Sequence, residues 1–445
     1  MKKSKKIGLG LLGLVVVLLV LPLLIPMETY LRKAESVASD AFGAPVTISS
    51  ANLFLLPTPR VSVSGVAIGK NLDVAINKLV VVPTLNTLFS EQRVIDVQLD
   101  QVVVKQSALK IYERLSKAKK EESPSPVALR KLSIEGLSLD WPDTKLPVTN
   151  VYLALKEGAL DSAKIDSVDG KITALLTPTG SGHHILLKVK RWELPTKSKL
   201  MVDSGEFDMM LKGSQLNVTQ FNIGMYGGAI TGNALLTWAK SWQASGVLNV
   251  KHLSLEAPSR LVSPRTYLSG SLDGSGRFSA KARDAGQLAD HLMANFQFTV
   301  KQGVLHGLDL VKAASLLIRQ DATGGQTQFD RFSGKLGVVG KQYKLSQLDV
   351  SSGLLSANGH VTISPKEELD GMVDVAVKQS VGLVAVPLVV SGSIDHPIVY
   401  PSKAAIAGAA VGTAILGPGV GTSLGIKASK GLDALKEGLF GGSDK

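Results

Sequence analysis

The chain has 445 residues, no cysteine, 44% hydrophobic but only 5% aromatic residues, and a formal net charge of +12. This apolar content is ample for a core and is mostly aliphatic. The lack of cysteine excludes disulfides and any metal or thiol chemistry based on cysteine. The basic residues do not form clusters interleaved with aromatic residues, so no nucleic-acid partner is expected. The positive surplus suits contact with anionic lipid headgroups, although it suits a soluble surface equally well.

The first 27 residues predict a membrane anchor. Four lysines within the first six residues precede an uncharged apolar run from Ile7 to Met27. At about 1.5 Å per helical residue, this run can cross the roughly 30 Å hydrocarbon core of a bilayer. The lysines indicate a single-pass protein with a cytoplasmic N-terminus and the bulk of the chain on the other side. The alternative is a cleaved signal peptide, which needs a shorter apolar core and small residues at a cut site.

After the anchor, one amphipathic helix and then many strands are expected. From Thr29 to Phe42 apolar residues recur at helical spacing, and Gly43 follows as a stop. Beyond it the pattern changes to alternation, which is typical of strands with one apolar and one polar face. Short Gly- and Pro-containing turns between the strands favour a long antiparallel meander. The alternating residues are Leu72, Val74 and Ile76; Ile95, Val97 and Leu99; Ile185, Leu187 and Val189; Leu216 and Val218; and Val373, Val375 and Val377.

Three later segments look helical. Ser107 to Lys120 runs into a charged, Pro-broken stretch that indicates a surface excursion, and Leu308 to Arg319 carries apolar residues at helical spacing. The third segment, Ala404 to Ile426, has no charge and repeats glycines at a spacing that lets helices approach closely in a membrane. It is either a hairpin in contact with a membrane or a cap on the sheet.

No motif in the chain supports catalysis. Gly8, Gly10 and Gly13 satisfy a dinucleotide fingerprint but lie inside the predicted anchor, and the G-x-S-x-G match at 421–425 has no histidine after it. The adjacent His183 and His184 would point to opposite faces of a strand. We therefore expect no enzyme, no catalytic residue, no metal site and no cofactor.

Several motifs, in their order along the chain, resemble the AsmA family of anchored periplasmic proteins. The resemblance extends over most of the chain and is most specific in its C-terminal part, whereas the Ala/Gly-rich tail after Tyr400 departs from the pattern. The motifs are GAPVTI at 43–48, PRVSVSGVAI at 59–68, LSIEGLSLDW at 132–141, MYGGAITGNA at 225–234, GVLHGLDL at 303–310, TQFDRFSG at 327–334 and PLVVSGSIDHP at 387–397.

The resemblance implies a mainly β protein that is similar to bridge-like lipid transfer proteins. In these, a long curved antiparallel sheet forms an open, taco-like groove with an apolar inner face, and a few short helices accompany it. The implied parts are an anchor (1–27), an N-terminal helix and strands (28–122), middle β-groove repeats (123–300), a C-terminal β domain (301–400) and a tail (401–445) that contacts a membrane or caps the sheet. The alternating residues from Ile95 to Val377 named above are the candidate groove lining.

The implied function is to hold phospholipid and transfer it from the inner membrane towards the outer membrane, in support of envelope integrity. The expected partners are phospholipids, the inner membrane through Ile7 to Met27, and an outer-membrane or envelope protein. The alternative function is a scaffold or assembly factor for outer-membrane proteins. The same alternation would also build a closed β-sandwich, whose apolar faces cover each other.

Overall fold

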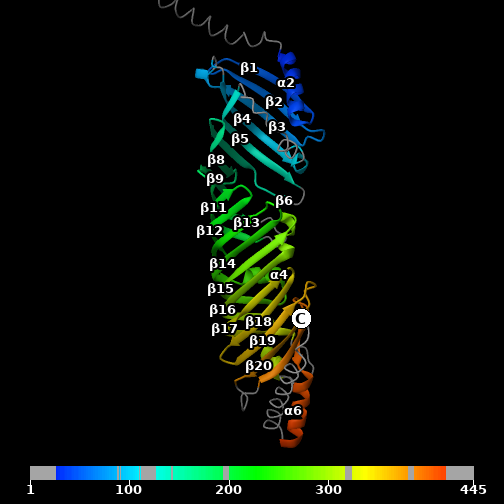
Figure 1. The fold of residues 1–445 in the computed structure, drawn as a ribbon. Coiled ribbons are helices and arrows are strands. Elements are labelled where there is room, and N and C mark those ends of the chain that lie inside the picture. Colours follow the sequence, from blue (N-terminus) through cyan, green and yellow to red (C-terminus); the bar gives the residue numbers. More distant parts are fainter. Residues whose placement is uncertain are drawn as a thin grey trace, which may run out of the picture. The chain divides into compact units, whose positions relative to one another are not determined.

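The computed structural model describes residues 27–87, 90, 92–109, 111, 127–141, 144–193, 200–315, 323–378 and 385–416. The chain divides into two compact units, Met1–Pro195 (unit 1) and Thr196–Lys445 (unit 2). Both units are mainly β, as predicted (Figure 1).

Unit 1 is one sheet in which each strand pairs with the next along the chain, with the short β6 paired beside β5. All pairs are antiparallel except β4 and β5, which are parallel. The strands are β1 (Val46–Phe54), β2 (Arg60–Ile68), β3 (Val74–Pro83), β4 (Arg93–Lys105), β5 (Val127–Trp141), β6 (Thr144–Lys145), β7 (Thr149–Lys156), β8 (Ala159–Ser167), β9 (Ile172–Thr179) and β10 (Gly182–Glu193).

The predicted long antiparallel meander is therefore broken by one parallel pair, β4 with β5. A parallel pair needs a long connection that brings the chain back to the end from which it started. The predicted helix from Ser107 to Lys120 falls in this connection. Of it, the structure describes the short η3 (Gln106–Ala108), Leu109 and Ile111, and the remainder lies outside the described residues.

Unit 2 is a sheet of twelve strands, β11 to β22, each antiparallel to the next. β15, β16 and β17 have 16 or 17 residues, while β18 to β22 have ten or fewer. The strands are β11 (Met201–Lys212), β12 (Gln215–Met225), β13 (Gly228–Thr237), β14 (Trp242–Ser254), β15 (Tyr267–Ala282), β16 (Leu292–Leu308), β17 (Thr323–Val339), β18 (Gln342–Ser351), β19 (Leu355–Ile363), β20 (Leu369–Val377), β21 (Ala385–Gly392) and β22 (Pro397–Pro401).

Few helices accompany the sheets. In unit 1, α2 (Met27–Phe42) confirms the predicted amphipathic helix and packs on β1. In unit 2, α4 (Glu256–Val262) precedes β15, α5 (Leu310–Ser315) follows β16, and α6 (Lys403–Leu416) follows β22. Short 3₁₀ turns lie at η2 (Leu85–Thr87), η4 (Ala285–Gln287) and η5 (Ala289–His291). Within the described ranges, no helix is long and apolar enough to cross a bilayer. The predicted anchor lies outside them, apart from Met27.

Candidate functional site: the apolar faces of the two sheets

In unit 1 the strand register aligns apolar residues into two continuous rows across nine strands. Residues directly opposite each other on paired strands share one face of a sheet. The first row is Leu53, Val61, Val81, Val97, Leu132, Leu153, Ala163, Leu176 and Ile185. The second row, beside it, is Ala51, Val63, Leu79, Leu99, Ile134, Val151, Ile165, Ala174 and Leu187. These residues form the apolar face of unit 1.

In the part of unit 1 that the structure describes, no second sheet covers the apolar face. Ile165 is exposed, and every other residue of the two rows is half-buried. In a closed sandwich the inner residues interdigitate with those of the facing sheet and are buried. The exposure of the rows therefore favours an open face over the closed sandwich. At about 4.8 Å between strands, nine strands span roughly 38 Å, more than the ~15 Å depth of one leaflet's hydrocarbon.

The opposite face of unit 1 carries the charges. One register row there consists of Ser50, Ser64, Lys78, Asp100 and Glu135. On the same face, the guanidinium of Arg130 donates two hydrogen bonds to Asp96, at 2.9 and 2.6 Å. This carboxylate raises the pKa of Arg130 through the hydrogen bonds and then through its charge. The sheet thus separates an apolar face from a polar one.

Unit 2 repeats this arrangement across twelve strands. One unbroken row is Phe207, Phe221, Gly232, Leu248, Gly276, Phe296, Leu336, Leu345, Val361, Gly371, Val390 and Val399. A second row is Met209, Val218, Ala234, Gly246, Phe278, Ala294, Val338, Tyr343, Ile363 and Leu369. These residues form the apolar face of unit 2. The opposite face has polar rows such as Thr231, Asn249, Ser275, Gln297 and Lys335.

The glycines in and beside the unit 2 rows leave the face apolar, because aromatic rings lie over several of them. A Cβ on Gly274 would come 2.5 Å from Cζ of Phe296, and a Cβ on Gly276 would come 2.8 Å from the same ring. The ring of Phe278 covers Gly246 in the same way. A phenylalanine over a glycine on the neighbouring strand shields the backbone and stabilises the pair. These aromatic residues thus cover the backbone at the glycines of the apolar face.

At the C-terminal end of unit 2 the apolar face is closed. Val375 and Leu388 are 0% exposed, and so is Ala405 of α6. They belong to one hydrophobic cluster with Ala313 and Ala314 of α5. The small residues of α5 let its backbone approach β20 to β22 closely. Within α6, Ala405 and Ala409 are buried in this cluster, as a cap on the sheet requires, while Gly417 to Ile426 lie outside the described residues.

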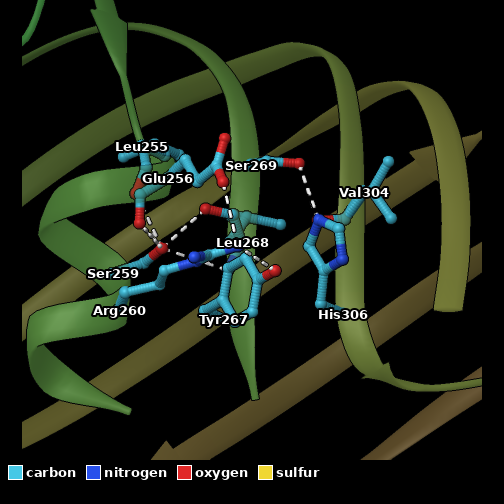
Figure 2. A network of polar contacts seen from close by, with 9 residues as sticks. All are labelled: Leu255, Glu256, Ser259, Arg260, Tyr267, Leu268, Ser269, Val304 and His306. Atoms are coloured by element: carbon cyan, nitrogen blue, oxygen red, sulfur yellow. Dashed lines mark hydrogen bonds and ion pairs between the residues drawn. The ribbon is translucent and has the colours of Figure 1, made fainter. Parts of the chain in front are cut away.

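A polar network beside this closed end holds α4 on β15. Figure 2 shows Arg260 over the ring of Tyr267, with its Cζ 4.3 Å from the ring centroid, and donating a 2.6 Å hydrogen bond to the phenol oxygen. The imidazole of His306 stacks on Tyr267 with its centroid 4.2 Å away, and lies 3.1 Å from the hydroxyl of Ser269. Glu256 pairs with Arg260 at 3.0 Å.

The connection between α4 and β15 also touches the turn between β21 and β22. Ser263 is 1% exposed, and its hydroxyl donates a 2.9 Å hydrogen bond to Asp395. Arg265 donates to the Nε2 atom of His396. The hydrogen bond from Ser263 is the main reason why the pKa of Asp395 lies below its ordinary value. Residues 132 positions apart in the chain therefore meet beside the closed end.

The structure distributes the predicted lining residues over three environments. On unit 1, Ile95, Val97, Leu99, Ile185 and Leu187 are half-buried, and Val189 is buried. On unit 2, Leu216 and Val218 are half-buried on the apolar face next to β11. Val373, Val375 and Val377 belong to the closed cluster or pack against it. Together they mark one face of each sheet and do not form one compact site.

Sequence reasoning missed how the strands keep their apolar residues on one face. In β2, β4 and β5 the apolar positions step by three residues at one point, from Val63 to Val66 and from Leu99 to Val102, for example. The steps contain residues with positive φ, namely Gly65 (63°), Gln101 (51°) and Gly136 (72°). Such residues break the alternation locally, and the apolar residues on both sides of each step pack in one cluster. The sequence signal that could have revealed these irregularities is a spacing of three between apolar residues within an otherwise alternating run.

Comparison with known protein families gave a match over the middle of the chain. Residues 135–339 match the model of the AsmA family. The match begins in β5 and ends with β17, so it contains most of the open rows of unit 2 and part of those of unit 1. Comparison with curated proteins gave no match.

Proposed function

We propose that the chain is a member of the AsmA family, whose model matches residues 135–339, and that its two apolar faces hold phospholipid acyl chains and pass lipid along the sheets. The observation that carries the proposal is the register, which lines up uncharged apolar residues without interruption across nine strands in unit 1 and twelve in unit 2. Contiguous apolar surface of this extent is rare on a protein unless it binds something.

The physical fit is to aliphatic chains. Each CH₂ group moved from water onto such a face contributes about 0.8 kcal/mol, so an extended acyl chain gains from a long apolar strip. The open side of the sheet leaves a charged headgroup in water, which avoids the cost of burying it. Holding and passing lipid in this way requires no nucleophile, base, metal or cofactor.

The proposal places the protein in the inner membrane, held by Ile7 to Met27, with both units in the periplasm. Lipid would then move from the inner membrane towards the outer membrane, with an envelope protein as the receiving partner. The orientation of the chain follows from the four lysines before the apolar stretch, which favour a cytoplasmic N-terminus.

The test is photo-crosslinking in cells with a benzophenone amino acid, using the full-length chain. The probe replaces Val97 or Leu248 on the apolar faces. The matched controls are Gln98 and Asn249, their neighbours on the opposite faces of the same strands. Mass spectrometry identifies what is attached.

We expect phospholipid on the Val97 and Leu248 probes and little on the two controls. Equal lipid labelling of both faces, or no lipid on either, would contradict the proposal. Crosslinks from the apolar faces to outer-membrane proteins instead of lipid would establish the scaffold function.

A further inference from the structure

Helix α2 has a second apolar side that unit 1 does not use. Tyr30 and Val37 are 63% and 61% exposed, and Ala34 and Ala41 are exposed as well. Their spacing of four, seven and eleven residues from Tyr30 places them on one side of the helix. We call these four residues the outward stripe. An exposed tyrosine and valine on one helix side, in line with two alanines, indicate a surface that contacts something apolar.

The other side of α2 is fixed to the sheet. Glu35 accepts a 2.7 Å hydrogen bond from the backbone N–H of Ile48, and Ser39 accepts one of 2.9 Å from Val46. Ala38 and Phe42 pack against the hydrophobic cluster of β1 to β4. The orientation of α2 on the sheet is therefore set, and the outward stripe cannot turn inward without breaking these contacts.

We propose that the outward stripe lies on the surface of a phospholipid bilayer. The first residue of α2, Met27, is also the last residue of the uncharged apolar run that begins at Ile7. The stripe therefore begins three residues after this run, which holds it at the membrane surface if the run is the anchor of the proposed function. Tyrosine favours this interface, and the exposed Lys33 beside Val37 on the helix surface can reach anionic headgroups.

This placement assigns the point where lipid reaches the sheet. The cluster that receives Ala38 and Phe42 also contains Val63, Leu79 and Leu99, which belong to the second row of unit 1. Helix α2 thus joins the stripe on its outer side to the apolar face on its inner side. Lipid leaving the bilayer beside α2 then meets the apolar face at β1 and β2.

The test uses single cysteines, because the chain has none of its own. Full-length Tyr30→Cys, Val37→Cys and the control Ser36→Cys, which is exposed on another side of α2, carry a nitroxide and are reconstituted into phosphatidylethanolamine–phosphatidylglycerol vesicles. Collision of the label with oxygen and with a water-soluble nickel complex is then measured. We expect the oxygen-to-nickel ratio at Tyr30→Cys and Val37→Cys to be severalfold higher than at Ser36→Cys.

Three outcomes would overturn the docking proposal. One is equal ratios at all three positions, and another is a label at Val37→Cys shielded from both reagents, which indicates a protein partner. The third is a chain that does not float with the vesicles. The proposal rests on the proposed function, but the two fail separately. If Val97 crosslinks to lipid while the outward stripe is exposed to water, the proposed function holds and the docking proposal fails. If the stripe is immersed in the bilayer but Val97 captures no lipid, the docking proposal holds and the proposed function fails.

Discussion

Strands β11 to β17 and strands β19 to β22 of unit 2 carry the same first apolar row, but they differ in the helices packed on them. The first group has α4 on β15, whereas the second group lies in one hydrophobic cluster with α5 and α6. Leu248, Phe296 and Leu336 in the first group are half-buried. In the second group Val375 and Leu388 are fully buried under α5 and α6. One register thus continues from an open face into a closed core.

The difference teaches that alternation determines a strand's apolar face but not what covers it. Cover depends on segments outside the strands, here on α5 and α6, whose alanines are buried in one cluster with the strand residues. An acyl chain that follows the rows from β11 meets these helices at the closed end. The open part is then suited to holding lipid and the closed part to stability, and the following changes test that division.

The largest effect is expected for Leu388→Asp, compared with Val218→Asp. Leu388 is fully buried, so the new carboxylate has neither water nor a partner, and the free energy of unfolding should fall by about 4 kcal/mol or more. Val218 is half-buried on the open part, so the same change should cost less stability but remove lipid crosslinking. Denaturant unfolding and the crosslinking assay measure the two effects. Equal losses of stability would contradict the division.

The second effect is expected from a chain that ends at Ser402 and so lacks α6. Removing the buried Ala405 and Ala409 uncovers the cluster around Val375, and the midpoint of thermal unfolding should fall by several degrees, about 2–4 °C for each kcal/mol lost. A photo-crosslinker at the half-buried Val373 should then attach to lipid only in the shortened chain. If Val373 captures lipid equally in the full chain, α6 does not close the face.

A smaller effect is expected for Phe296→Ala on the open part. The change uncovers Gly274 and Gly276, and because Phe296 is only half-buried the loss should be about 1–2 kcal/mol, below the 3–5 kcal/mol of a fully buried phenylalanine. The control is Gln297→Ala, on the exposed opposite face of β16, which should change stability by less than about 0.5 kcal/mol. A loss as large as that of a core phenylalanine would show that this part is also covered.

Much of the fold was predictable because the sequence periods are local. The helix of α2 and the strands around Val97, Leu187, Val218 and Val375 follow from period and spacing alone. Leu72 was wrongly included in a strand. It lies in the turn before β3 and has a φ of 54°. The prediction failed because the apolar alternation of β3 extends by chance to this residue. The parallel pairing of β4 with β5 and the cover of Val375 by α6 depend on distant segments, which no local pattern encodes.

The smallest effect concerns the contact between Ser263 and Asp395 beside the closed end. The hydrogen bond from Ser263, and then the backbone of Arg265 and the nearby His396 and Arg265 side chains, hold the pKa of Asp395 below its ordinary value. A carboxyl whose pKa is lower in the folded than in the unfolded chain stabilises the fold at neutral pH. That contribution is lost as the pH falls from about 4, the ordinary pKa of an aspartate in the unfolded chain, through the lower pKa of Asp395 in the folded chain.

In Asp395→Asn this contribution is absent at every pH. The melting temperature of the variant should therefore lie slightly below that of the native chain at neutral pH and approach it in acid. Thermal melting of both chains across this range is the measurement, and Asp349→Asn, on an exposed position of β18, is the control. A constant gap between the native and Asp395→Asn curves would mean that Ser263 binds the side chain irrespective of its charge, and that the contact beside the closed end does not depend on pH.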